Sequence, residues 1–177
     1  MSLKENSKKV IRMWTVIKFD KNNLEILRKD FQKKLGEDII IYSPKLFIQK
    51  YKNNKLVNLE FNLLGDYLFC FHKKFQNPEV VNSLKFTRGL KYFLNGFNRS
   101  QEEIKKFIGK CKESEDAKGC LTQNFFKLYK KSNYKFNSGP FAEKIFKIID
   151  LQRDKICILL GNVKTTIDKK KFLFSPV

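Results

Sequence analysis

The side chains best suited to chemistry are few and scattered in this chain of 177 residues. His72 is the only histidine, and it follows the apolar run Tyr67–Phe71 with no obvious carboxylate to orient it. The acid pair Glu102 and Glu103 stands at an expected helix start, where capping of the helix explains both residues. We therefore expect no catalytic residues and no enzymatic activity.

Metal and cofactor sites are also not expected. The four cysteines form no C-x-x-C pair, so neither a zinc site nor a disulfide framework is indicated. Cys70 and Cys157 lie within apolar runs, which is typical of buried free thiols. The sequence contains no phosphate-binding P-loop, no dinucleotide-binding glycine motif and no H-E-x-x-H motif.

The formal net charge of +19 has two explanations that the sequence leaves open. One is an electrostatic footprint for nucleic acid. The other is a compositional bias of AT-rich coding, because Lys, Asn, Phe and Ile abound while alanine is confined to Ala117 and Ala142. The charges are scattered rather than clustered, so charge alone does not decide between them.

A packed protein away from membranes is expected. The chain is 42% hydrophobic, which is enough for packed cores, but no run approaches the roughly 18 consecutive apolar residues of a membrane span. Residues 1–12 are polar and Lys-rich and lack an apolar signal core. We expect a cytoplasmic protein that acts as a monomer.

The first part of the chain, residues 10–109, predicts an α+β domain. Its strand-like and helix-like segments alternate in the order β-α-β-β-β-α-β-α, which favours an antiparallel sheet with helices packed on one face. Strands are expected at 12–19, 39–51 (interrupted by Pro44), 56–61, 67–71 and 89–94, and helices at 24–35, 78–84 and from 100 onward.

The remainder divides into a linker and a small β-domain. Residues 110–131 are largely polar and charged, which is typical of a linker. Residues 132–177 contain short apolar runs joined by tight turns, including the two-residue hairpin signal Gly161-Asn162. Short strands over so few residues bury a core only when they form a small barrel.

Four segments, in order, resemble motifs of the NusG family of transcription elongation and antitermination factors. Residues 14–16 (WTV) resemble its opening strand, and residues 64–69 (LGDYLF) resemble its PGYVFV strand. Residues 87–94 (TRGLKYFL) resemble its TRGV-x-x-FV segment, and residues 138–142 (SGPFA) resemble the GPF loop that opens its C-terminal barrel. The resemblance covers the chain from about Met13 to its end.

The resemblance implies that the protein functions by binding other macromolecules and not by catalysis. It implies an N-terminal NGN domain that binds the clamp of the RNA polymerase β′ subunit, and a C-terminal SH3-like KOW barrel that recruits a small-subunit ribosomal protein or the Rho termination factor. The segment 78–83 matches a region that touches the gate loop of the β subunit in specialised, RfaH-like paralogues, although its residues do not reproduce the His-Thr pattern found there.

The resemblance also assigns site residues. Tyr67 and Phe69 match the docking strand for polymerase, and Phe93 lies on a neighbouring expected strand. Their alternation places Tyr67, Phe69 and Phe71 on one face of a sheet, where an apolar hollow could accept a helix tip. Thr87 and Arg88 match the segment that touches non-template DNA in RfaH-like paralogues. The partner-recruiting loop is formed by Gly139, Pro140 and Phe141.

Departures from the family pattern favour a specialised RfaH-like paralogue over the housekeeping factor. Leu64 replaces the usual proline, Asn95-Gly96 replaces a glycine pair, and the glycine expected after the GPF loop is replaced near Phe146. RfaH-like proteins switch their C-terminal domain between a helical hairpin and a barrel, and the Gly161-Asn162 hairpin with its β-branched flanks favours the barrel here.

A second hypothesis from a different class is a KOW-type RNA-binding protein of the ribosome or of translation. The first domain discriminates between the two hypotheses. An exposed aromatic hollow favours polymerase binding, whereas a continuous basic face with stacked aromatic side chains favours RNA.

Overall fold

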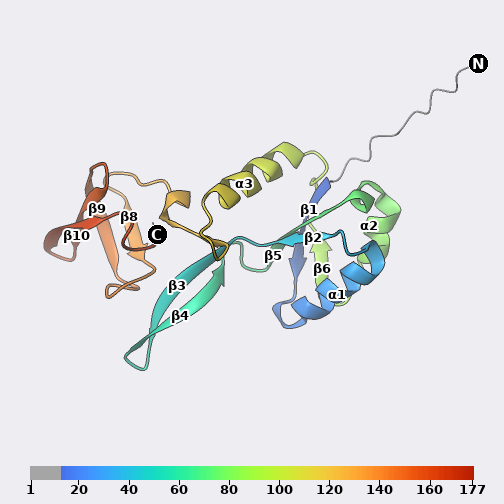
Figure 1. Cartoon of the computed structure of the whole chain (residues 1–177), viewed down its shortest axis with the longest axis horizontal. Helices are drawn as coiled ribbons and strands as arrows, with labels where there is room; N and C mark the ends of the chain where they lie inside the picture. The colour runs from blue at the N-terminus through green and yellow to red at the C-terminus, as the bar shows by residue number, and fades with distance from the viewer. Residues whose placement is uncertain (1–12) are drawn as a thin grey trace, which may run out of the picture. The chain divides into compact units, whose positions relative to one another are not determined.

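The computed structural model describes residues 13–177 of the chain as a mixed α/β protein with three α-helices and several sheets (Figure 1). It divides into two compact units, which we describe separately. The N-terminal unit comprises residues up to Ser43 together with Leu64–Phe107, and the C-terminal unit comprises Pro44–Leu63 together with Ile108–Val177. The expected strand residue Arg12 and the expected domain residues 10 and 11 lie outside the described residues.

The N-terminal unit is built on a four-stranded sheet whose recorded pairings are all antiparallel, in the order β2-β5-β1-β6. The predicted strands at these positions are confirmed, and the break at Pro44 ends β2. The strands are β1 (Met13–Phe19), β2 (Ile40–Tyr42), β5 (Tyr67–His72) and β6 (Leu90–Phe93).

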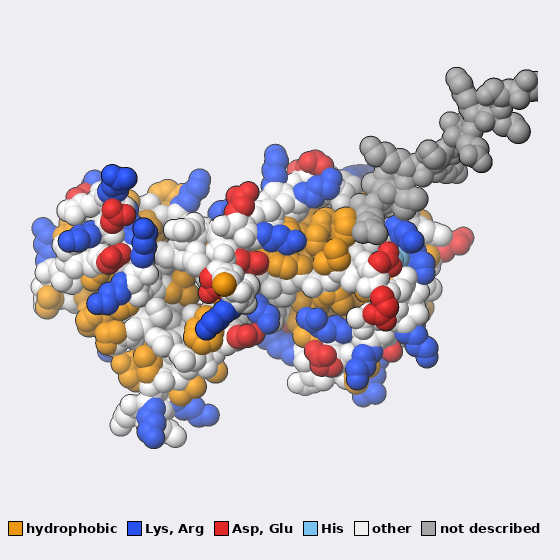
Figure 2. Space-filling view, in the orientation of Figure 1, with side chains coloured by type: hydrophobic (Ala, Val, Ile, Leu, Met, Phe, Trp, Pro, Cys, Tyr) orange, Lys and Arg blue, Asp and Glu red, His pale blue; other side chains and the backbone are white. Residues whose placement is uncertain are grey.

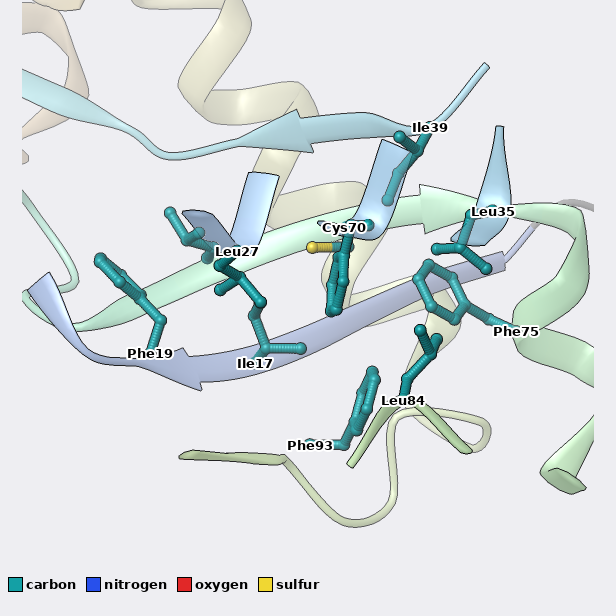
Figure 3. Close-up of a cluster of buried hydrophobic side chains, with 11 residues drawn as sticks. Ile17, Phe19, Leu27, Leu35, Ile39, Cys70, Phe75, Leu84 and Phe93 are labelled. Atoms are coloured by element: carbon teal, nitrogen blue, oxygen red, sulfur yellow. The ribbon is translucent and has the colours of Figure 1, made fainter. Parts of the chain in front are cut away.

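Two helices bury the main core of this unit against one face of the sheet. They are α1 (Leu24–Leu35) and α2 (Pro78–Leu84), and short 3-10 turns precede them at Lys21–Asn23 and Lys73–Gln76. Asn77 caps α2, since its side chain accepts a hydrogen bond from the Glu79 N–H at 2.9 Å. The core between helices and sheet is drawn in Figure 3 and includes the side chains of Ile17, Phe19, Leu27, Phe31, Leu35, Leu68, Cys70, Phe75, Leu84 and Phe93.

The third helix, α3 (Gln101–Glu113), lies against the other face of the same sheet. The side chain of Gln101 accepts a hydrogen bond from the backbone N–H of Trp14 at 2.9 Å and donates one to its carbonyl at 2.7 Å. The Phe107 ring lies 5.7 Å from the Phe69 ring. The expectation that all helices pack on one face is therefore wrong, because α3 covers part of the opposite face.

The C-terminal unit contains a hairpin from the middle of the chain. Strands β3 (Lys45–Lys52) and β4 (Lys55–Asn62) pair in register around Asn53 and Asn54, which both have positive φ. A short strand, β7 (Cys120–Leu121), runs parallel to β3, and a 3-10 turn follows at Gln123–Phe125. The hairpin tip predicted at residues 52–55 is confirmed.

The same unit contains a five-stranded antiparallel sheet in the order β11-β10-β9-β8-β12, which corresponds to the expected barrel strands. Its strands are β8 (Asn133–Phe136), β9 (Ile145–Leu151), β10 (Lys155–Leu160), β11 (Val163–Asp168) and β12 (Phe174–Pro176). Alternate residues are buried in one cluster, formed by Tyr134, Phe136, Phe146, Ile148, Ile156, Ile158 and Phe174.

The compact units differ from the domain boundaries expected from sequence. The hairpin at Lys45–Asn62 groups with the C-terminal unit, although it falls inside the expected range 10–109. The expected linker at 110–131 includes the last turn of α3, strand β7 and the 3-10 turn at Gln123–Phe125. Cys111, Cys120 and Leu121 are buried within it.

Candidate functional site

An apolar hollow of about 520 Å³ opens on the face of the N-terminal sheet that carries α3. Its floor is formed by adjacent strands, because Val16 on β1 pairs with Phe69 on β5. The Val16 carbonyl also accepts a hydrogen bond from the Leu94 N–H at 2.8 Å. One wall is α3, through Glu103, Ile104 and Phe107, and Leu64 and Tyr67 complete the lining. Figure 2 shows hydrophobic side chains gathered on the N-terminal unit below α3.

Two of the three predicted polymerase-binding residues line this hollow. Tyr67 lies at its edge, and Phe69 is buried in its floor with 5% of its surface exposed. Aromatic contacts hold the Phe69 ring, which lies 6.4 Å from the Trp14 ring and 6.2 Å from the Tyr42 ring. Such a rigid apolar floor is suited to receiving the apolar side chains of a helix.

Phe93, the third predicted residue, lies on the opposite face of the sheet. Its ring packs in the main core, 6.5 Å from the Phe31 ring and 6.1 Å from the Phe75 ring (Figure 3). Because side chains alternate along β6, its neighbours Tyr92 and Leu94 face the hollow side instead. The alternation of residues 90–94 was the signal that could have identified Leu94, which is 43% exposed.

A row of polar and aromatic side chains adjoins the hollow at Tyr67. Lys18 on β1 is the register partner of both Tyr67 on β5 and Tyr92 on β6. The two phenol oxygens lie 3.0 Å apart, and the Lys18 Nζ lies 5.4 Å and 5.9 Å from the two ring centroids. The hydrogen bond with Tyr67 raises the pKa of the Tyr92 phenol, which therefore keeps its proton at neutral pH.

The predicted DNA-contacting residues have different surroundings. Thr87 is buried, and its hydroxyl accepts a hydrogen bond from the Lys34 Nζ at 3.0 Å. Arg88 is exposed at the turn that leads into β6, and Phe86 on the other side of Thr87 is 91% exposed. Arg88 can therefore reach a ligand in this loop, whereas Thr87 holds the loop against α1.

The predicted partner-recruiting loop contacts the hairpin of its own unit. The Gly139 N–H donates to the Gln49 side-chain oxygen at 2.6 Å, and the Pro140 carbonyl accepts from the Tyr51 hydroxyl at 3.0 Å. Phe141 packs against the Phe136 ring at 5.6 Å but keeps 40% of its surface exposed. Phe141 is thus an accessible aromatic side chain of the predicted loop.

His72 has an orienting carboxylate that the sequence did not suggest. Its Nε2 lies 3.0 Å from the Asp38 Oδ1, and its Nδ1 accepts a hydrogen bond from the Lys74 N–H at 3.2 Å. The proton therefore sits on Nε2, directed at Asp38. The ring is fully buried, and both of its nitrogens are engaged within the protein.

The cysteines are free and buried, as expected for Cys70 and Cys157. Burial raises the pKa of the Cys70 thiol to about 12, so this group is not a nucleophile at neutral pH. Within residues 13–177, no cluster of three or more His, Cys, Asp or Glu side chains could hold a metal ion. No helix in that same range is long and apolar enough to cross a membrane.

Replacing Asp38 with asparagine should reduce the acid sensitivity of the N-terminal unit. The hydrogen bond from His72 lowers the pKa of the Asp38 carboxyl, so this group stabilises the fold above its ordinary pKa near 3.8. That stability is lost as the pH falls through the lowered value. Unfolding followed by Trp14 fluorescence between pH 5 and pH 2 should show wild type and Asp38→Asn converging as the pH falls below 3.8. A difference that stays constant over that range would contradict the assignment.

Among known proteins, this chain is similar only in structure to those described below. No protein-family model matches this chain, and no curated protein does. The chain is similar to Thermotoga maritima NusG, from a structure of its domain interaction, with 13% identity over 90% of this chain and 96% of that chain, at a TM-score of 0.35. It is also similar to a chain of the MjSpt4:Spt5 complex in conformation B, with 14% identity over 93% of this chain and 98% of that one, at a TM-score of 0.31. Both TM-scores lie below 0.5.

Proposed function

We propose that this chain is a transcription elongation or antitermination factor of the NusG type. In this proposal the N-terminal unit, as an NGN-like domain, binds the clamp of RNA polymerase. The observation that supports it is the apolar hollow, which contains Tyr67 and Phe69 at the positions where the family's motif carries its docking residues. An exposed aromatic hollow favours polymerase binding over RNA binding. The apolar side chains at the tip of a helix can fill such a hollow.

The C-terminal unit is proposed to act as a KOW-like module that recruits a further protein. Phe141, which is 40% exposed beside the bonded Gly139 and Pro140, is the residue of the predicted loop that a partner could bury. For non-template DNA we propose Arg88 as the contact, with Phe86 beside it as a surface on which a base could stack. Thr87 is assigned a supporting role because it is buried.

Binding of purified core RNA polymerase to the full chain tests the proposal. Replacing a side chain that anchors the helix in the hollow should cost about 2 kcal/mol of binding free energy, which is about thirtyfold in affinity. We therefore expect Tyr67→Ala and Leu94→Ser to bind polymerase about thirtyfold more weakly than wild type. Phe69→Ala should do the same, with its folded state checked by Trp14 fluorescence because Phe69 is buried.

The matched control is Tyr129→Ala, which removes a tyrosine that is 58% exposed in the C-terminal unit. It should bind polymerase as wild type does. If the folded hollow variants bind polymerase as tightly as the control, the docking assignment is wrong. If neither wild type nor variants bind polymerase while the chain binds RNA, the KOW-type RNA-binding function replaces the proposal, consistent with the net charge of +19.

A further inference from the structure

The row formed by Tyr67, Lys18 and Tyr92 gives the apolar hollow a polar border of defined chemistry. The three side chains stand side by side on neighbouring strands, because Lys18 is paired in register with both tyrosines. This places the ammonium group between two aromatic rings rather than at the end of an unsupported side chain. The contacts with both rings reduce the entropy that Lys18 would lose on binding a ligand.

The row offers hydrogen-bond donors. An ammonium group has three N–H donors and no acceptor. The contact between the two phenols uses the O–H of only one tyrosine as donor, so the other O–H can donate elsewhere. Asp66, which precedes Tyr67, forms an ion pair with Lys21 at 2.9 Å, and the charge of Lys18 contributes less than Lys21 to lowering the pKa of its carboxyl. The row therefore suits an anionic acceptor such as a carboxylate.

The α3 wall of the hollow carries the reverse charge. Glu103 lines the hollow from α3, next to Ile104 and Phe107. A ligand with a carboxylate would be repelled from this wall and attracted to the row that contains Lys18. The hollow therefore has an apolar floor, a carboxylate on its α3 wall and a cation next to Tyr67 at its border.

We propose that Lys18, supported by Tyr67 and Tyr92, binds an acidic side chain of the partner helix that occupies the hollow. This inference rests on the proposed function and adds to it the chemistry that selects and orients the helix. The occupant is an amphipathic helix whose apolar residues fill the hollow and whose acidic residue flanks them on the side of Lys18. Nucleic acid fits less well, because a phosphate backbone would leave the apolar floor of Val16, Phe69 and Leu94 uncovered.

The test measures the affinity of the full chain for core RNA polymerase at low and at moderate salt. Lys18→Gln removes the charge and keeps a polar side chain, and it should weaken binding about tenfold at low salt. Salt should weaken wild-type binding more steeply than binding of the variant, because the ion pair is screened. Lys18→Arg keeps a cation over the two rings and should retain most of the wild-type affinity.

The matched control is Lys33→Gln, which removes the same charge from α1 on the other face of the sheet. It should bind polymerase as wild type does, with the wild-type dependence on salt. If Lys18→Gln and Lys33→Gln have the same affinity, while Tyr67→Ala and Leu94→Ser bind weakly, this inference is wrong and the proposed function stands. If the hollow variants bind normally, the proposed function itself fails.

A charge-reversal experiment identifies the acidic residue. Lys18→Glu should bind polymerase more weakly than Lys18→Gln, and a lysine replacing one acidic residue of the clamp helices should restore its binding. Failure of every such replacement to restore binding would overturn the proposal. So would a loss of affinity for single-stranded DNA in Lys18→Gln with polymerase binding intact, since that result would assign Lys18 to a phosphate contact.

Discussion

Replacing Gly89 with alanine is expected to destabilise the N-terminal unit by about 3 kcal/mol. Gly89 has a φ of +85°, a conformation that costs other residues about 1–2 kcal/mol. A Cβ there would also lie 2.8 Å from the Asn23 carbonyl oxygen and 3.2 Å from the Leu27 Cβ. The start of α1 would have to shift, and such overpacking costs about 1–3 kcal/mol. The backbone of Gly89 is itself engaged, as its carbonyl accepts from the Asp20 N–H at 2.8 Å.

Gly96→Ala is the matched control for this prediction. Gly96 has a φ of +82°, but no atom lies within 4 Å of a Cβ built there. The substitution should therefore lower the free energy of unfolding only by the cost of the backbone conformation, about 1–2 kcal/mol. Urea unfolding followed by the fluorescence of Trp14, the only tryptophan, measures both variants in the same unit. Equal losses of stability would show that α1 does not constrain the Gly89 position.

Local patterns in the sequence were sufficient to predict most helices and strands. The helix at Leu24–Leu35 follows from Leu24, Leu27, Phe31 and Leu35 at helical spacing. Three of these four side chains are buried, and Leu24 is partly buried. The hairpin tip at Asn53 and Asn54 follows from residues that tolerate positive φ. Both predictions depend on neighbours within a few positions, which is the range over which sequence patterns are informative.

The grouping of the hairpin with the C-terminal unit could not be predicted in this way. It depends on contacts between residues about ninety positions apart, such as the hydrogen bond from the Gly139 N–H to Gln49. Gln49 and Tyr51 look like ordinary strand residues, and nothing in their own neighbourhood indicates a distant partner. The same holds for His72, whose partner Asp38 belongs to a turn that is 34 residues earlier in the chain.

The candidate site was predicted in part, and the errors have a physical cause. Tyr67 and Phe69 were assigned from the family resemblance, and alternation along their strand placed both side chains on one face of the sheet, where they line the hollow. Phe93 was misplaced because the face of a residue on β6 depends on its register with β1, where it pairs with Ile17 in the core layer. Lys18 was missed because its importance comes from two strands that bring Tyr67 and Tyr92 beside it.

Replacing Phe136 with alanine is expected to cost the C-terminal unit about 4 kcal/mol, a large share of the stability of a typical domain. Phe136 is fully buried on β8. Its ring lies 4.4 Å from that of Phe146, 5.7 Å from that of Phe172 and 6.1 Å from that of Phe174. Removing it leaves a cavity beside Phe146 and Phe174, which are held in place by β9 and β12, so the surroundings cannot close over it.

Phe141→Ala is the control, because Phe141 touches the same Phe136 ring from the loop but is 40% exposed. It should cost about 1 kcal/mol, in proportion to the smaller area that it buries. Hydrogen exchange of the amides in β8, β9 and β10 measures both variants within the unit concerned. Protection should fall far more in Phe136→Ala than in Phe141→Ala. Similar losses in the two variants would show that the cluster around Phe136 can repack, and that the exposed loop contributes to stability as much as the core does.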